Sequence, residues 1–175
     1  MGLTYILVKP EAIKHVEEIK RDILNSGFEI IKEKEIDFEY YLIRQLYSPE
    51  RLNYPTEWDN RIMSIFIPNI YSANFGSCRF LKAHAFLLSY KNDAIKKLVE
   101  VTGPTDAKEY KKPKNAETLR GRYGLGPEYN IKITIDNDER KDADECEWCF
   151  NAIHRPSKEE ELDRGLKILF PDLSF

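Results

Sequence analysis

The chain has 175 residues, of which 42% are hydrophobic, so it can bury a substantial core, and we expect a single domain over residues 1–175. Its formal net charge of -3 comes from interspersed acidic and basic residues, which indicates neither nucleic acid nor a membrane surface as a partner. No apolar run is long enough to cross a bilayer and no secretory signal opens the chain, while three cysteines do not form a disulfide framework. We therefore expect a cytoplasmic protein with free thiols.

The first predicted unit is a buried strand followed by a helix. Residues 3–9 (LTYILVK) are apolar up to Lys9, which is typical of a strand buried on both faces. Pro10 then opens a helix over about 11–25, whose apolar residues recur at helical spacing. Gly27 supplies its stop.

The next segment predicts a strand, a helix and a long irregular stretch. Residues 28–38 loosely alternate apolar and charged side chains, as in a half-exposed strand. Residues 39–47 carry apolar side chains at helical spacing. Residues 48–80 mix aromatic residues with proline, asparagine and glycine, so we expect little regular structure there beyond some short helix.

A third strand and helix follow. Residues 83–90 (AHAFLLSY) predict the strand, and NDAIKKLVEV predicts a helix capped by Asn92 or Asp93. The polar segment over 105–130 is loop-like.

The last part of the chain predicts one more core strand and helix. Residues 131–135 predict an added strand, and 136–148 an acidic surface excursion. Residues 149–154 (CFNAIH) predict the core strand, and Ser157 with Glu160 form an S-x-x-E capping box for the final helix. The apolar stripe of that helix consists of Leu162, Leu166 and Leu169.

Four strands alternating with four helices favour an α+β sandwich, with helices packed on one sheet. The same order also permits a parallel α/β arrangement, and periodicity does not choose between the two.

Three side chains suggest phosphate chemistry. His154 ends an apolar strand just before a helix, where free backbone N–H groups favour an anion and imidazole is a competent nucleophile or general base. Lys9 ends a buried strand, and Arg120 carries a planar fork suited to phosphate oxygens. Each residue also has a structural reading, as a hydrogen-bonded core histidine, a lysine that reaches solvent and a solvated loop arginine.

A zinc site is the alternative use of this histidine. Cys146 and Cys149 form C-x-x-C, and His154 follows five residues later. A structural zinc ion needs four ligands, and the fourth would have to be Cys78, His84 or a distant carboxylate.

Three blocks of the sequence, taken together, resemble the nucleoside diphosphate kinases. They are TYILVKPEAIK, TGPTDAKEYKKPKNAETLRGRYG and NAIHRPSKEEELDRGLKILF, in that order. The resemblance implies a ferredoxin-like sandwich with a four-stranded antiparallel sheet. It also implies transfer of a γ-phosphate between nucleoside triphosphates such as ATP and nucleoside diphosphates such as ADP, through a phosphohistidine in two half-reactions. Mg²⁺ would be bound to the nucleotide phosphates, and the protein would be a homo-oligomer.

The resemblance assigns a role to six residues. They are His154 as the nucleophile, Lys9 at the transferred phosphate, Tyr47 near the nucleophile, Thr105 and Arg120 at the nucleotide phosphates, and Asn151 at the sugar.

The sequence departs from the family pattern near the histidine. Pro156 stands where the family has a serine, and Gly165 where it has a glutamate that helps to orient the histidine. Glu160 or Glu161 could substitute for that glutamate. A family arginine aligns near Val99, and Lys96 or Lys97 could supply its charge only if the register shifts. These departures favour the alternative of a non-catalytic nucleotide-binding or regulatory domain of the same fold.

Two insertions relative to the family are predicted, at about 48–80 and 126–148. The aromatic residue that stacks on the base would lie in the first, with Tyr54, Trp58 and Phe66 as candidates. The acidic run of the second would repel nucleotide phosphates, so we expect it at the surface or in a subunit contact.

Overall fold

The computed structural model describes residues 1–39, 42, 45–46, 67–75, 81–135 and 144–173. Its main sheet has four strands in the order β2-β3-β1-β6, and each neighbouring pair is antiparallel. These strands are β1 (Gly2–Val8), β2 (Glu29–Asp37), β3 (Lys82–Tyr90) and β6 (Ile153–His154). The predicted α+β, ferredoxin-like sandwich with an antiparallel sheet is confirmed, and the parallel alternative is wrong.

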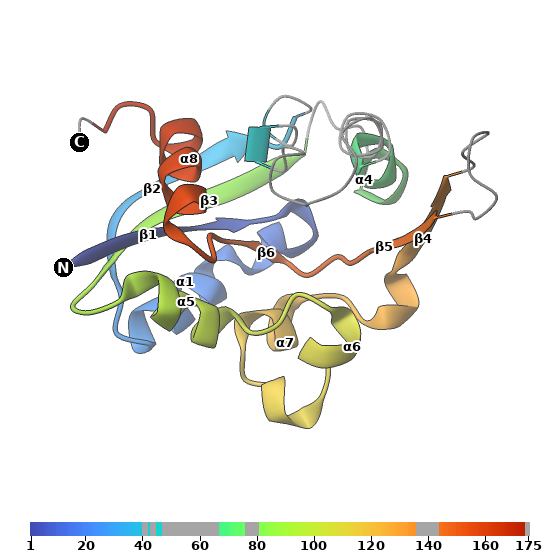
Figure 1. The fold of residues 1–175 in the computed structure, drawn as a ribbon, viewed down its shortest axis with the longest axis horizontal. Coiled ribbons are helices and arrows are strands. Elements are labelled where there is room, and N and C mark those ends of the chain that lie inside the picture. Colours follow the sequence, from blue (N-terminus) through green and yellow to red (C-terminus); the bar gives the residue numbers. More distant parts are fainter. Residues whose placement is uncertain (40–41, 43–44, 47–66, 76–80, 136–143, 174–175) are drawn as a thin grey trace.

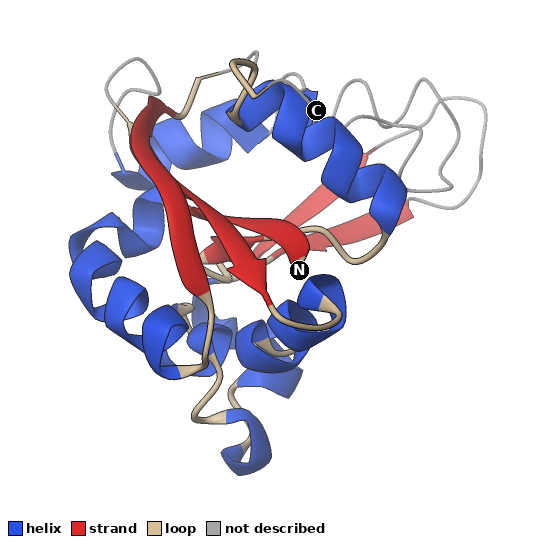
Figure 2. Cartoon of the chain, turned by 90° about the vertical axis from the view of Figure 1, so that its left-hand side faces the viewer, coloured by secondary structure: helices blue, strands red, loops and turns tan. Residues whose placement is uncertain are grey.

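Helices cover both faces of this sheet (Figures 1 and 2). Helices α1 (Val16–Asn25) and α5 (Ala94–Thr102) lie on one face, and α8 (Glu159–Leu169) lies on the other. Helix α4 (Ile67–Phe75) belongs to the stretch in which little regular structure beyond some short helix was predicted. It lies near one end of the sheet, and α8 lies near the opposite end. Among the described residues, no helix is both long and apolar enough to span a membrane.

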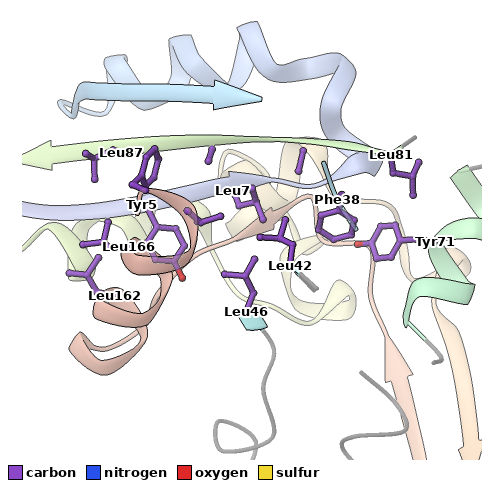
Figure 3. Packing of buried hydrophobic residues seen from close by; sticks show 14 of the residues in the cluster. Tyr5, Leu7, Phe38, Leu42, Leu46, Tyr71, Leu81, Leu87, Leu162 and Leu166 are labelled. Atoms are coloured by element: carbon purple, nitrogen blue, oxygen red, sulfur yellow. The ribbon is translucent and has the colours of Figure 1, made fainter. Parts of the chain in front are cut away.

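The central strand β1 separates two hydrophobic clusters because successive strand side chains point to opposite faces. Tyr5 and Leu7 belong to the cluster under α8, parts of which are drawn in Figure 3. Ile6 and Val8 belong to the cluster under α1 and α5. All four side chains are fully buried, which explains why β1 lacks the alternation of a surface strand.

The first predicted helix is two elements rather than one. Residues Pro10–His15 form a 3-10 helix, η1, and the α-helix α1 begins only at Val16. Proline opens η1 without the loss of a hydrogen bond, because the first N–H groups of a helix are unpaired in any case. Gly27 adopts φ 90°, and so ends the unit as predicted.

The segment over 105–130 is not a loop, as the sequence suggested, but a series of short helices. These are α6 (Ala107–Tyr110), η5 (Pro113–Asn115), α7 (Leu119–Tyr123) and η6 (Pro127–Tyr129). Asp106 and Thr118 cap α6 and α7 by accepting backbone N–H bonds. Elements of three to five residues are too short to show a hydrophobic period, which is why the pattern missed them.

The predicted strand over 131–135 is present as β4 (Ile131–Ile135). It pairs with β5 (Asp144–Trp148), which the sequence placed in an acidic surface excursion. The two strands form a separate ribbon that extends away from the main sheet (Figure 1).

Helix α8 begins at Glu159, and its buried stripe is Leu162, Leu166 and Leu169 as predicted. The predicted capping box with Glu160 is wrong. Glu161 instead accepts hydrogen bonds from the backbone N–H (2.8 Å) and hydroxyl (2.9 Å) of Ser157.

The remaining helices are confirmed in part. Asp93, rather than Asn92, caps α5 by accepting a bond from the Lys96 N–H. In the helix predicted over 39–47, Leu42, Gln45 and Leu46 are helical. Tyr47 and the three candidate stacking aromatics lie outside the described residues.

Candidate functional site

The end of β1 and the short strand β6 bring Lys9 and His154 into one region. His154 lies opposite Leu7 in the antiparallel pairing of β1 with β6. Lys9 follows β1 directly, and its backbone N–H donates to the Ala152 carbonyl at 2.8 Å. The predicted strand over 149–154 is therefore only two residues long, because the backbone turns sharply just before it.

That turn is strained. Ala152 has φ 63°, and the Ile153 N–H donates to the Asn151 carbonyl at 2.7 Å across it. A non-glycine residue in the left-handed region costs about 1–3 kcal/mol and persists only where the surroundings impose it. Here the Ala152 N–H donates to the Glu11 carboxylate at 3.2 Å, while its carbonyl accepts the Lys9 bond. The start of η1 thus holds the backbone that presents His154.

Lys9 and Glu11 form a buried ion pair. The Lys9 Nζ lies 3.0 Å from a Glu11 carboxylate oxygen, and the two side chains are 2% and 0% exposed. Tyr71 of α4 donates its hydroxyl to the same carboxylate at 3.1 Å. The Trp148 ring, from the end of β5, lies 5.5 Å from the Lys9 Nζ.

Burial lowers the pKa of Lys9, an effect that Glu11 opposes and the positive charge of Arg120 reinforces. A buried cation beside a second cation favours an anionic ligand, because such a ligand relieves both the desolvation and the repulsion.

Arg120 ties the helical segment to β6. Its guanidinium donates to the Gly103 carbonyl at 2.9 Å, to the Thr105 hydroxyl at 3.1 Å and to the Ile153 carbonyl at 3.0 Å. Arg120 is 4% exposed. The planar fork can satisfy these acceptors together, whereas a lysine has a single nitrogen to share among them.

Asn151 and Thr105 meet on the exposed side of this network. The Asn151 side-chain amide donates to the Thr105 backbone carbonyl at 3.3 Å. Asn151 is buried, and Thr105 is exposed. Tyr110 fixes the adjoining backbone, since its hydroxyl donates to the Leu125 carbonyl at 2.5 Å. Burial raises the pKa of Tyr110, so this phenol keeps its proton.

His154 itself lies in more apolar surroundings. Its side chain is buried, and its Nε2 lies 3.4 Å from the hydroxyl of Tyr5. The centroids of the two rings are 6.1 Å apart. Next to it, the Arg155 Nε donates to the Thr102 hydroxyl at 2.6 Å, against the last turn of α5. Neither Tyr5 nor Arg155 was among the predicted site residues.

Five of the six residues with a predicted role therefore lie along connected contacts between β1, β6 and the helices over 105–123. Tyr47 lies outside the described residues, and the role of each of the six stays a prediction. The sequence missed Glu11, which reads as an ordinary acidic residue in a first helical turn. The sequence signal that could have indicated this ion pair is a carboxylate two positions after a lysine that ends a buried strand.

The zinc hypothesis gains no support. Within the described ranges, no group of three or more histidine, cysteine, aspartate or glutamate side chains is arranged to hold a metal ion. Cys149 is not part of a disulfide. His84 lies on β3 with its Nε2 3.7 Å from Glu33, while Cys78 lies outside the described residues, as does the side chain of Cys146.

Comparison with curated proteins gives distant relatives, and no family model matches the chain. Thioredoxin domain-containing protein 6 of Xenopus laevis is 26% identical over 174 residues, which is 97% of this chain and 22% of that protein. Its counterpart in Homo sapiens is 25% identical over 98% of this chain and 42% of that protein. The chain thus spans less than half the length of the curated relatives it matches.

Comparison with solved structures gives nucleoside diphosphate kinases. The enzyme of Aquifex aeolicus aligns over 97% of this chain and 94% of its own, with TM-score 0.66 and 22% identity. The enzyme of Borrelia burgdorferi, solved with bound vanadate and ADP, aligns over 99% and 91%, with TM-score 0.63 and 18% identity. At these identities the similarity is one of fold: the chain has the fold of the nucleoside diphosphate kinases.

Proposed function

We propose that this protein is a nucleoside diphosphate kinase, which transfers the γ-phosphate of a nucleoside triphosphate to a nucleoside diphosphate through phosphorylated His154. The observation that carries the proposal is that a buried histidine pairs with the strand that ends at the buried Lys9, and directly follows the Ile153 carbonyl that the buried Arg120 bonds, in this fold. A neutral nucleophile with cationic neighbours suits a polyanionic substrate.

The chemistry divides into two half-reactions. In the first, a lone pair of the His154 imidazole attacks the γ-phosphorus, and the bond from phosphorus to the bridging oxygen breaks, so that the nucleoside diphosphate leaves with the electron pair. In the second, a terminal oxygen of another diphosphate attacks the same phosphorus, and the nitrogen–phosphorus bond breaks. The substrate enters as the Mg²⁺ complex of the nucleotide, whose phosphates hold the ion.

Each cation has a different task in this scheme. Lys9 would stabilise the charge on the transferred phosphoryl group, because its ammonium is already desolvated and held by Glu11. Arg120 would bind the phosphates that stay on the nucleotide, together with the exposed hydroxyl of Thr105. Asn151 would contact the sugar, and Tyr47 would lie near the nucleophile. Contacts to phosphate and sugar leave the base unread, which predicts broad base tolerance.

The second candidate is a non-catalytic nucleotide-binding domain of the same fold. It is favoured by Pro156 and Gly165, which stand where the related kinases have serine and glutamate. Against it stands the linked set of Lys9, Arg120 and His154.

Intact mass distinguishes the two candidates. The protein is weighed before and after incubation with ATP and Mg²⁺, and then after addition of a diphosphate with another base. The kinase gains one phosphoryl group and loses it to the diphosphate, and His154→Gln abolishes the gain. His15→Gln serves as the control, since His15 lies partly exposed on η1. Nucleotide binding without any gain of mass would identify the non-catalytic domain.

We further propose that residues 1–175 act as one domain, with 48–80 and 126–148 as insertions, and that the protein is a homo-oligomer. Deletion of the ribbon formed by β4 and β5 tests whether that insertion is a subunit contact. A lower oligomer mass is the expected result, and an unchanged mass would contradict the contact. Trp148, at the base of the ribbon, stays in the deletion variant because it packs over Lys9.

A further inference from the structure

The group that faces His154 is an aromatic hydroxyl. The Tyr5 hydroxyl lies 3.4 Å from the His154 Nε2, and the two ring planes are inclined by 31°. This separation is longer than that of a well-formed hydrogen bond. Tyr5 is fully buried within the cluster under α8, so its ring has little freedom to turn away.

Gly165 makes the space that the Tyr5 side chain occupies. A Cβ atom at Gly165 would lie 2.1–2.2 Å from the Cε1, Cζ and hydroxyl oxygen of Tyr5, a distance that no real side chain tolerates. Figure 3 shows Tyr5 reaching from β1 to Leu162 and Leu166 of α8, the helix that carries Gly165. Glycine is the one residue that allows α8 and this ring to coexist. The sequence alone identified Gly165 only as a missing carboxylate.

The direction of the contact determines which ring nitrogen carries the proton and which carries the lone pair. If Tyr5 donated to Nε2, the neutral imidazole would carry its proton on Nδ1. If Tyr5 accepts from an Nε2–H, the Nδ1 keeps a lone pair directed away from the tyrosine. In the second case the attack forms a bond between Nδ1 and phosphorus, and the Nε2 proton stays in place throughout.

We propose that Tyr5 is the positioning residue of His154, accepting its Nε2–H, and that Gly165 is present because it admits this ring. The inference rests on the proposed function, in which His154 is the nucleophile. A tyrosine is a neutral acceptor, and it can lie in an apolar cluster without the desolvation cost of a carboxylate. It also adds no negative charge next to the incoming phosphates.

The test uses the full chain with ¹⁵N-labelled histidine. Tyr5→Phe keeps the ring and removes the hydroxyl, and Tyr90→Phe is the matched control, because Tyr90 lies at the opposite end of the sheet against Phe28. Nitrogen NMR gives the fraction of the Nε2–H tautomer of His154, identified by its absence in His154→Gln. Single-turnover kinetics with Mg²⁺-ATP give the rate of phosphorylation separately from nucleotide affinity.

The wild type is expected to hold the Nε2–H tautomer almost completely. Tyr5→Phe should lower that fraction and slow phosphorylation about five- to tenfold, with nucleotide affinity changed less than about twofold. An unchanged tautomer fraction in Tyr5→Phe would overturn the inference, whatever the activity. A changed fraction in a protein that never takes up phosphate would support the contact while refuting the proposed kinase.

Gly165→Ala provides an independent second variant. The new methyl group must displace the Tyr5 ring, so Gly165→Ala in an otherwise wild-type protein should lower the Nε2–H tautomer fraction of His154 as Tyr5→Phe does. In the Tyr5→Phe background it should cause no further tautomer change, because the contact is already absent. A further change of the same size in that background would show that Gly165 acts on His154 by another route, and would overturn its assigned role.

Discussion

The candidate site has two halves that are built in different ways. The lysine half consists of Lys9, Glu11 and Arg120: Lys9 pairs with Glu11, and Glu11 and Arg120 each make at least two polar contacts. The histidine half consists of His154, Tyr5 and Gly165, where a long contact between His154 and Tyr5 lies within hydrophobic packing. In the lysine half, position depends on charge pairing, so one lost partner should affect folding. In the histidine half it depends on shape, so one lost hydroxyl should affect the chemistry alone.

The largest expected effect breaks the lysine half. Glu11→Ala leaves the Lys9 ammonium buried without its partner, and should lower the free energy of unfolding by about 3–5 kcal/mol, measured by urea denaturation. The control is Glu33→Ala, which removes a partly exposed pair with Lys20 at 2.7 Å and should cost less than about 1 kcal/mol. Equal losses in the two variants would contradict the contrast between the two halves.

The next effect breaks the histidine half by shape. Gly165→Ala overlaps the Tyr5 ring and should cost about 2–3 kcal/mol, although alanine normally favours a helix. Asp163→Ala, on the exposed side of the same helix, is the control and should be nearly neutral. Adding Gly165→Ala to Tyr5→Ala should cost little, since the overlapping ring is then absent. A full additive cost would mean that the ring is not the obstacle.

A third change tests whether the lysine half needs the planar geometry of Arg120 as well as its charge. Arg120→Lys keeps the charge but loses the fork that joins Gly103, Thr105 and Ile153, so nucleotide affinity should fall about tenfold by calorimetric titration. Arg122→Lys, two positions along in a surface pair with Asp22, should leave affinity unchanged. If both variants bound equally well, charge without geometry would be sufficient.

A fourth change tests the strained turn between the two halves. Ala152→Gly removes the penalty of φ 63° but adds unfolded-state entropy, so stability should rise by about 1 kcal/mol or less. Ala83→Gly in β3 should have the opposite sign, because that alanine is a buried strand residue. Thermal denaturation checks both. A loss of stability in Ala152→Gly would show that the turn is not strained.

The smallest effect lies outside both halves, where α7 meets α1. Tyr123 donates to Asp22 at 2.7 Å, and burial together with this bond raises its pKa to about 12. An unfolded tyrosine ionises near 10, so between about pH 10 and 12 the folded state holds a proton that the unfolded state loses. Stability therefore falls as pH rises through this window. Tyr123→Phe should lack this part of the fall, by less than about 1 kcal/mol, in denaturation at several alkaline pH values.

Much of the framework was predictable from local pattern. Lys9 ends a strand that is apolar throughout, Gly27 stops the following helix, and Leu162, Leu166 and Leu169 recur at helical spacing. These features depend on neighbouring residues, and a single sequence reports them well. The short helices over 105–130 and the strand β5 escaped prediction because no hydrophobic period of sufficient length marks them.

The partners of the site residues depend on contacts between distant parts of the chain. Glu11 pairs with Lys9 two positions away, but its carboxylate is also bonded by Tyr71, and the Ala152 turn closes on it from the other end of the chain. Tyr5 and Gly165 are 160 positions apart in the sequence. Only the packing of α8 on β1 places the Tyr5 ring where a side chain at position 165 would overlap it.

The sequence by itself determined the order of the core strands and of the longer helices, the buried central strand, and a histidine and two cations of types suited to phosphate, because these depend on composition and periodicity. The tertiary structure alone decided that the sheet is antiparallel, that Glu11 holds Lys9, and that Tyr5 lies next to His154. Those outcomes depend on which segments, distant in the sequence, pack together and bury their apolar surfaces from water. The periodicity of a single sequence does not show which segments pair in this way.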